Sequence, residues 1–194
     1  MNAFRDFTPK RRNITTLVKN HGDHRSDLKL DYKDRCGWCN DIDTWRVMWF
    51  EIDHFVPQKY LVKISSTDYS NLVYACRSCN NAKRFKWPTK DENIHNKKDE
   101  GFIDPCDDTY NDQFSRHTDG RISYQTKLGE WIYNALKFYK PQHEIIWNIE
   151  VLDNLIDEIE ELLSHNSDAM LADRLMLCYK EFRNYVKELS KTGM

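Results

Sequence analysis

Residues 36–86 read CGWCNDIDTWRVMWFEIDHFVPQKYLVKISSTDYSNLVYACRSCNNAKRFK, and the expected fold follows from this segment. Two Cys-x-x-Cys pairs, Cys36 with Cys39 and Cys76 with Cys79, stand near its two ends. Two such pairs can hold one metal ion between four thiolates, which is the tetrahedral arrangement of structural zinc. Redox-active dithiols are the alternative interpretation. We therefore expect one structural Zn2+ to pin the ends of this segment together.

The residues between and after the two pairs predict two strands and a helix. Residues 44–55 are dense in aromatic and β-branched side chains, which favours a strand, and Pro57 ends it. Residues 71–76 predict a second short strand, and a helix rich in Lys and Arg is expected from about Asn80 to Phe85. Strand, loop, strand and helix, pinned by zinc, make a small ββα unit.

Polar side chains with complementary chemistry gather in this unit. Asp53 and His54 are adjacent, and Glu51 shares the strand face of Asp53 because side chains alternate. The Asp53 carboxylate suits a hard cation, and the His54 imidazole suits removal of a proton from water. Asn80 can bring an amide oxygen from the helix, with Asn81 as its rival, turned about 100° away. A base and a cation are what phosphodiester hydrolysis requires.

At these residues the chain resembles the HNH (ββα-metal, His-Me finger) endonucleases, over about residues 36–88. The resemblance implies that His54 is the general base and Asp53 a ligand of the catalytic metal. It further implies that Asn71 braces the loop and orients the histidine. Asn80 stands where the last His of the motif usually lies, which makes this chain an H-N-N variant. Because an amide oxygen is a poor ligand for softer ions, we expect Mg2+ or Mn2+ at this position.

The resemblance and the sequence pattern together predict an α+β fold in three segments. Residues 1–30 are a basic N-terminal segment, in which Thr15 and Thr16 precede an apolar pair that is compatible with a short helix. Residues 31–90 are the nuclease domain with its zinc. Residues 91–194 are a linker and hairpin followed by a mostly helical region.

The third segment contains clear local signals. Asp119-Gly120 predicts a β-hairpin turn, and residues 129–139 predict a helix. Apolar residues spaced by three and four over 145–163 and again over 171–189 predict two amphipathic helices joined as a helical hairpin. We interpret their apolar stripes as core, with an interaction surface as the alternative.

Charge is divided unevenly along the chain. Residues 1–90 carry 17 Lys and Arg against 10 Asp and Glu, whereas residues 91–194 carry 12 against 21. A polyanion is therefore expected to meet the first half, unless the split is ordinary drift. Lys83, Arg84 and Lys86 follow Asn80 closely, and we expect them to contact phosphates, with Lys83 nearest the scissile one. A solvated basic patch is the alternative.

Composition excludes other classes of protein. Hydrophobic residues make up 40% of the 194 residues, which is enough for a core and excludes a disordered chain. No apolar run is long enough to span a bilayer, and no apolar signal segment opens the chain, so a soluble cytoplasmic protein without a membrane partner is expected. His21 and His24 are interpreted as surface residues, and Cys106 and Cys178 as buried or free thiols.

The sequence thus predicts a metal-dependent HNH endonuclease that hydrolyses nucleic acid, with double-stranded DNA as the expected substrate. Chains of this kind resemble nuclease subunits of bacterial anti-phage systems such as the Septu type, which work with an ATPase, and they also resemble restriction nucleases. That resemblance implies an ATPase partner on the acidic helical region. The competing hypothesis is a non-catalytic zinc-knuckle module that binds nucleic acid or protein.

Overall fold

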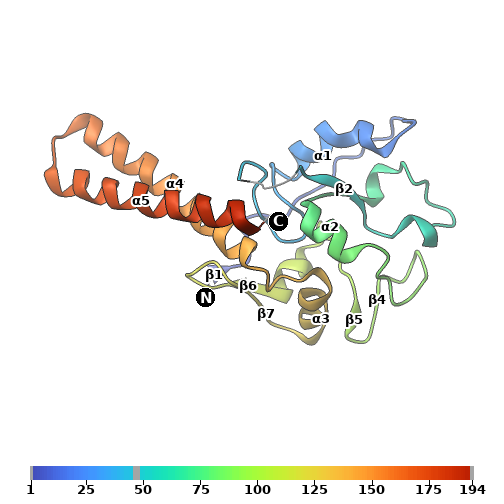
Figure 1. Cartoon of the computed structure of the whole chain (residues 1–194). Helices are drawn as coiled ribbons and strands as arrows, with labels where there is room; N and C mark the ends of the chain where they lie inside the picture. The colour runs from blue at the N-terminus through green and yellow to red at the C-terminus, as the bar shows by residue number, and fades with distance from the viewer. Residues whose placement is uncertain (1, 46–48, 193–194) are drawn as a thin grey trace.

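The computed structural model describes residues 2–45 and 49–192, which form a body and a two-helix arm that projects from it (Figure 1). The helices are α1 (Arg25–Asp31), α2 (Arg77–Lys83), α3 (Lys127–Leu136), α4 (Pro141–His165) and α5 (Ala169–Thr192). The strands are β1 (Asn2–Ala3), β2 (Glu51–His54), β3 (Leu72–Ala75), β4 (Asn96–Lys97), β5 (Glu100–Gly101), β6 (Phe114–Arg116) and β7 (Ile122–Tyr124). Short 3-10 helices are η1 (His21–His24), η2 (Gln58–Tyr60), η3 (Tyr69–Asn71) and η4 (Asp108–Gln113).

The antiparallel pair β2–β3 and the helix α2 form the predicted ββα unit. The register pairs Glu51 with Ala75 and His54 with Leu72. All four residues of β3 are buried, because this apolar strand lies within the core. The first strand is shorter than expected: β2 begins at Glu51, and the residues 46–48 of the predicted strand lie outside the described residues. The helix begins at Arg77, directly after the strand, rather than at Asn80.

A second sheet has the order β1-β6-β7 and is antiparallel throughout. The turn between β6 and β7 contains Gly120 at φ +89°, a conformation that glycine adopts without strain, as the Asp-Gly signal predicted. The edge strand β1 comes from the N-terminus and pairs with Arg116 and Ser115. This pairing joins the first residues of the chain to the segment after residue 100.

One core cluster runs through the whole body, from Phe4 to Phe138. The ring of Phe4 lies 5.1 Å from that of Phe114, and Phe102 lies 5.6 Å from Trp38 in the cysteine knuckle. Residues 1–30, 31–90 and those after residue 90 therefore share one core, although the three-segment division itself stays a prediction. The α+β class with a helical C-terminal region is confirmed.

The N-terminal segment differs from its expected structure. Residues 11–18 are not helical, and the helix of this region is α1, which begins only at Arg25. The interpretation of His24 as a surface residue is wrong: its side chain is buried, with its ring 5.1 Å from that of Tyr69. The helix α1 has only seven residues, most of them polar, so its sequence shows no clear helical periodicity.

The arm consists of α4 and α5, which pack against each other along their length (Figure 1). Asp168 accepts hydrogen bonds from the backbone N–H groups of Met170 and Leu171 and so caps the start of α5. Burial is concentrated at the base, where Ile145, Ile146, Ile149 and Leu189 form a second cluster. Beyond this cluster many apolar side chains of α4 and α5 are exposed. The interpretation of the apolar stripes as core therefore holds at the base of the arm and holds less well toward its tip. None of the described helices is long and apolar enough to cross a membrane.

Candidate zinc centre and active site

The four cysteines of the two pairs meet at one buried point. Their sulfur atoms lie within 4.8 Å of one another, and all four side chains are buried. The first pair lies on a tight turn in which Cys36 N–H donates to the carbonyl of Asp41 and Asn40 has φ +65°. The second pair begins α2, where Cys76 accepts a hydrogen bond from the backbone N–H of Cys79. The distances and the soft donor set fit one tetrahedral Zn2+.

Electrostatics at this cluster favour a thiolate at Cys36, whereas the pKa values of the other three cysteines, Cys39, Cys76 and Cys79, are raised. Burial acts to raise the pKa of Cys36, but hydrogen bonds with Cys39, Cys76 and Cys79 outweigh it and hold that pKa well below the ordinary value. The backbone N–H of Cys76 also donates to the Cys36 sulfur at 3.2 Å. Metal binding requires deprotonated sulfur, so the fold prepares at least one ligand for the ion.

Side chains from outside the nuclease segment support the cysteine turn. Nδ1 of His143, in the first turn of α4, lies 2.6 Å from Oδ2 of the buried Asp41. The buried guanidinium of Arg116 donates to the carbonyls of Cys39, Gly120 and His143. Arg116 therefore ties β6, the arm and the zinc turn together, which sequence spacing could not reveal.

His54 lies at the end of β2 with its ring fixed in one orientation. Its Nε2 lies 2.7 Å from the carbonyl oxygen of Ser66. Because a carbonyl can only accept, this shorter contact places the proton on Nε2 and the lone pair on Nδ1, and the side-chain nitrogen of Gln58, 3.3 Å from the same atom, then makes no hydrogen bond to it. Desolvation is the largest cause that lowers the pKa of His54, and the charges of His21 and Lys83 lower it further, against the opposing hydrogen bond to Ser66. The imidazole is thus kept neutral, as a base requires.

Asn71 closes the loop that follows His54. Its side-chain oxygen accepts from the N–H of Val56 at 2.8 Å, and its amide donates to the carbonyl of Val56 at 3.1 Å. The carbonyl of Asn71 also accepts from the N–H of Phe55. This buried residue holds the chain on both sides of the turn after His54, which is the geometry of a bracing residue.

Asp53 is engaged by a buried cation. Nζ of Lys83 lies 3.2 Å from the carboxylate, and Nε1 of Trp38 donates to the same group at 3.0 Å. Lys83 is fully buried and also donates to the carbonyl of His54 at 2.6 Å. Burial raises the pKa of Asp53 and lowers that of Lys83, while their mutual attraction opposes both shifts. The structure thus places Lys83 differently from the expected phosphate contact, because its side chain turns inward to pair with Asp53.

Asn80 faces β2 as expected, but its contact is with Glu51. Nδ2 of Asn80 donates to Oε2 of Glu51 at 2.7 Å, and Arg77 lies 3.5 Å from the same carboxylate. Glu51 and Asp53 occupy one strand face, and Asn80 and Lys83 occupy the facing side of α2. Carboxylate and amide oxygens of the kind that Mg2+ or Mn2+ prefers therefore line this interface.

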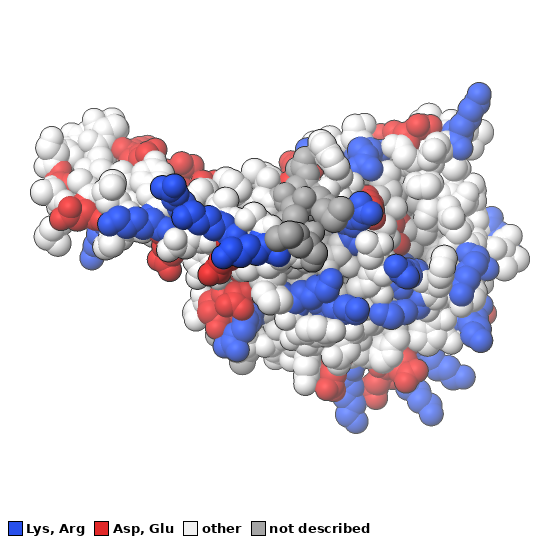
Figure 2. Space-filling model, in the orientation of Figure 1, with Lys and Arg blue, Asp and Glu red and all other residues white. Residues whose placement is uncertain are grey.

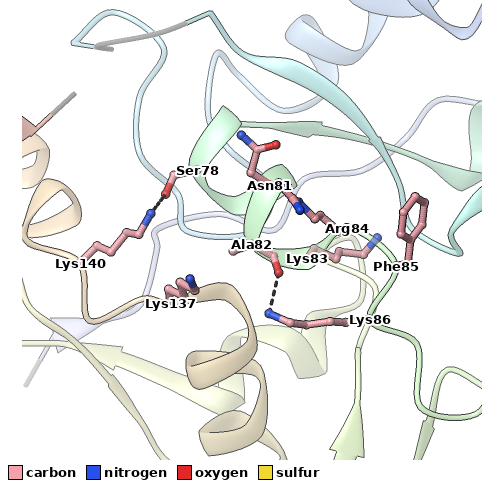
Figure 3. A pocket seen from close by; sticks show the side chains of 9 residues that line it. All are labelled: Ser78, Asn81, Ala82, Lys83, Arg84, Phe85, Lys86, Lys137 and Lys140. Carbon is pink, nitrogen blue, oxygen red and sulfur yellow. Dashed lines mark hydrogen bonds between the residues drawn. The ribbon is translucent and has the colours of Figure 1, made fainter. Parts of the chain in front are cut away.

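The other two predicted basic residues lie on the opposite flank of α2. Arg84 and Lys86 line a groove of about 610 Å³ together with Lys137 and Lys140 of the connection between α3 and α4 (Figure 3). The last two lysines belong to the acidic half of the sequence. Only the folded chain brings them beside α2, so counting charge by halves missed them.

One further residue near the site was missed in the sequence. The ring of His21, from η1, lies 4.8 Å from the ring of His54 in an edge-on arrangement. We had interpreted His21 as an ordinary surface residue, since nothing in its spacing connects it with His54. The two histidines are 33 positions apart in the sequence, and the fold brings their rings together.

A ββα unit with a four-cysteine cluster, a histidine at the strand end and an asparagine brace is the arrangement that the sequence resemblance led us to expect. Residues 34–86 match the family model described as HNH endonuclease. The match covers just over a quarter of the chain, and it confirms the resemblance found in the sequence for these residues. No curated protein and no solved structure matches the chain.

Proposed function

We propose that the protein is a metal-dependent endonuclease that hydrolyses phosphodiester bonds in DNA. The observation that carries this proposal is the position of His54: it ends β2 inside the matched HNH segment, braced by Asn71 and kept neutral by its surroundings. A general base for water needs a neutral imidazole held in one orientation. A purely structural histidine would not require both.

In the proposed reaction, Nδ1 of His54 removes a proton from a water molecule, and the resulting hydroxide attacks phosphorus in line with the leaving oxygen. The bond between Nε2 and the carbonyl of Ser66 fixes the tautomer and stabilises the imidazolium that forms. Asn71 keeps the ring in place through the backbone of Val56.

A divalent cation, Mg2+ or Mn2+, would be held by Asn80 with the carboxylates of β2, and when bound it would stabilise the negative charge on phosphate and the leaving 3' oxygen. Glu51 already contacts Asn80. Asp53 contributes a ligand only if its carboxylate turns away from Lys83, so we assign it to the site as a proposal that awaits metal titration.

The test is nicking of supercoiled plasmid by the purified protein with Mg2+, Mn2+ or EDTA. We expect cleavage with either cation and none with EDTA, and a loss of at least about a hundredfold in His54→Ala, the usual contribution of a general base. His165→Ala, an exposed histidine on the arm, is the matched control and should retain activity. Undiminished cleavage by His54→Ala would remove His54 from the mechanism.

The second candidate is a non-catalytic zinc module that binds nucleic acid. The engagement of Asp53 by Lys83 and Trp38 favours it, since a carboxylate with two donors is less available to a cation. The same assay separates the two: binding of plasmid without cleavage under every cation supports the non-catalytic module.

The biological setting is proposed from the resemblance alone. A role in anti-phage defence or restriction, with an ATPase subunit on the acidic arm, would require a stable complex between the two purified proteins. Cytoplasmic location is likewise a prediction, to be tested by fractionation of the host cell.

A further inference from the structure

The groove on the outer flank of α2 is built from two distant segments of the chain. Arg84 and Lys86 follow α2, whereas Lys137 and Lys140 lie in the connection from α3 to α4 (Figure 3). Nζ of Lys86 donates to the carbonyls of Ala82 and Ala135, at 2.7 Å each, and so joins the ends of the two helices. The relative position of the two walls is therefore fixed by the fold.

The charge of this groove is of one sign. Four cationic side chains reach it beside the buried Lys83, and no Asp or Glu is among its described lining residues. Figure 2 shows the corresponding band of Lys and Arg across the body below the arm. Desolvation lowers the pKa of Lys86, and the charges of Lys137 and Arg84 lower it further. Bringing like charges together is unfavourable, and a bound polyanion would relieve that repulsion.

Ordinary helix electrostatics explain only part of this arrangement. Arg84 and Lys137 end α2 and α3, where cations interact favourably with the helix dipole. Lys140 does the opposite: it occupies the N-cap of α4, where a cation is unfavourable, and provides no capping hydrogen bond. Its ammonium instead lies 3.2 Å from Ser78 of α2, at the groove. The position of Lys140 thus indicates a role in the groove rather than in the helix.

The groove lies across α2 from the face that contacts β2. Asn80 and Lys83 point toward β2, whereas Ser78 and Asn81, about 160° and 100° around the helix from Asn80, line the groove. A helix is about 10 Å wide, which corresponds to about three nucleotides along one strand. A backbone that passes the end of β2 at His54 and crosses α2 would therefore continue into the groove within a few nucleotides.

We propose that this groove is a phosphate-binding subsite in which Lys137 and Lys140, outside the HNH segment, join Arg84 to hold the nucleic-acid backbone a few nucleotides from the cleaved bond. The inference rests on the proposed function, because it takes nucleic acid as the substrate. It makes the connection before the arm part of the substrate platform. A phosphodiester backbone fits better than a single anion, since the cations are spread along an open groove.

The test measures binding of a fluorescent DNA duplex to the full chain without added Mg2+ or Mn2+, over a range of salt concentrations and with two unrelated sequences. For Lys137→Ala/Lys140→Ala, we expect weaker binding to both sequences and a slope of log affinity against log salt that falls by about 1.8, or about 0.9 per lost contact. Lys180→Ala/Lys187→Ala removes the same charge from exposed positions of α5 and should leave the slope unchanged.

Because Lys140 also contacts Ser78, the single variant Lys137→Ala is measured with thermal unfolding of each protein. Lys137→Ala should fold normally, and its slope of log affinity against log salt should fall by about half as much as in the double variant, or about 0.9. An unchanged slope in folded Lys137→Ala and in the double variant would overturn the subsite, even if plasmid is cleaved. Loss of slope without any cleavage by wild type would instead support the subsite and contradict the nuclease. An equal loss in the α5 control would show a non-specific effect of net charge and overturn the subsite.

Discussion

The ammonium of Lys83 lies 3.2 Å from the carboxylate of Asp53, with both side chains buried at the interface of α2 and β2. The pair sits below Trp38 and Phe102, whose ring centres lie 5.5 Å and 5.7 Å from Nζ. It therefore joins the helix, the strand and the aromatic core at one point. In this arrangement Lys83 stabilises the fold around the site and is not exposed to contact a phosphate.

The first prediction concerns this pair. Lys83→Met should lower the free energy of unfolding by about 3–5 kcal/mol, because it leaves the buried carboxylate of Asp53 unpaired. Lys83→Met/Asp53→Asn should recover much of that loss, since the amide oxygen still accepts from Trp38 and no buried charge remains. Urea unfolding measures both, with Lys187→Met on α5 as the control within about 0.5 kcal/mol of wild type. A single variant as stable as the control would contradict the pairing.

The second prediction concerns pH. Burial lowers the pKa of His54, so the base stays neutral below the ordinary value of about 6.5, and the acid limb of cleavage should lie below that pH. The electrostatic effect of the nearby His21 also lowers the pKa of His54, so His21→Ala should raise that pKa and move the limb to higher pH. Proton NMR titration of the His54 ring measures the pKa directly, even in the absence of cleavage. If the acid limb or the pKa of His54 moves to lower pH in His21→Ala, then His21 does not lower the pKa of His54 in the wild-type protein.

The third prediction concerns the zinc centre. Metal analysis should find one tightly held zinc per chain, and Cys36→Ser or Cys79→Ser should unfold the body, because binding at a structural site contributes about 10–16 kcal/mol to folding. Cys178→Ser on the arm is the matched control and should keep both zinc and fold. Zinc content with near-UV circular dichroism provides the measurement, and a zinc-free protein with full tertiary signal would exclude the structural role.

The fourth prediction concerns the extent of the folding unit. A chain ending at residue 90 should not fold, because it lacks Phe102, Tyr110 and Phe114 of the common core. Replacing residues 153–180 with a short loop should leave the body folded, since the described side chains of the arm are buried mainly near its base. Limited proteolysis and thermal unfolding compare the two. If a chain of residues 1–90 folds and binds zinc, then this part of the core does not need the residues after 90.

The sequence predicted those features that depend on local periodicity or fixed spacing. The Cys-x-x-Cys pairs, the Asp119-Gly120 turn and the two long helices follow from patterns a few residues long, and each lies where it was expected. The inward turn of Lys83 could not be predicted, because its spacing from Asn80 fits either a phosphate or a buried acid. The choice depends on Trp38 and Phe102, which cover the ammonium.

Other features depend on contacts between distant segments. Lys137 and Lys140 reach the groove only because α3 packs against α2, and His21 reaches His54 only through η1. The count of charges by halves assigned both lysines to the acidic half, residues 91–194, which was not expected to meet a polyanion. The pairing of β1 with β6 is equally invisible, because a two-residue strand carries no periodic signal.

The shared aromatic core also limits how the matched segment can be inherited. The matched segment ends at residue 86, yet the rings that cover Trp38 come from residues beyond 100 and the packing is completed by Phe4. Recombination that moved the matched segment alone would leave Trp38 without Phe102 and Tyr110, and we expect the transferred piece to misfold. The unit that can pass intact between genomes is therefore the whole body, whereas the outer part of the arm is free to be exchanged or to diverge.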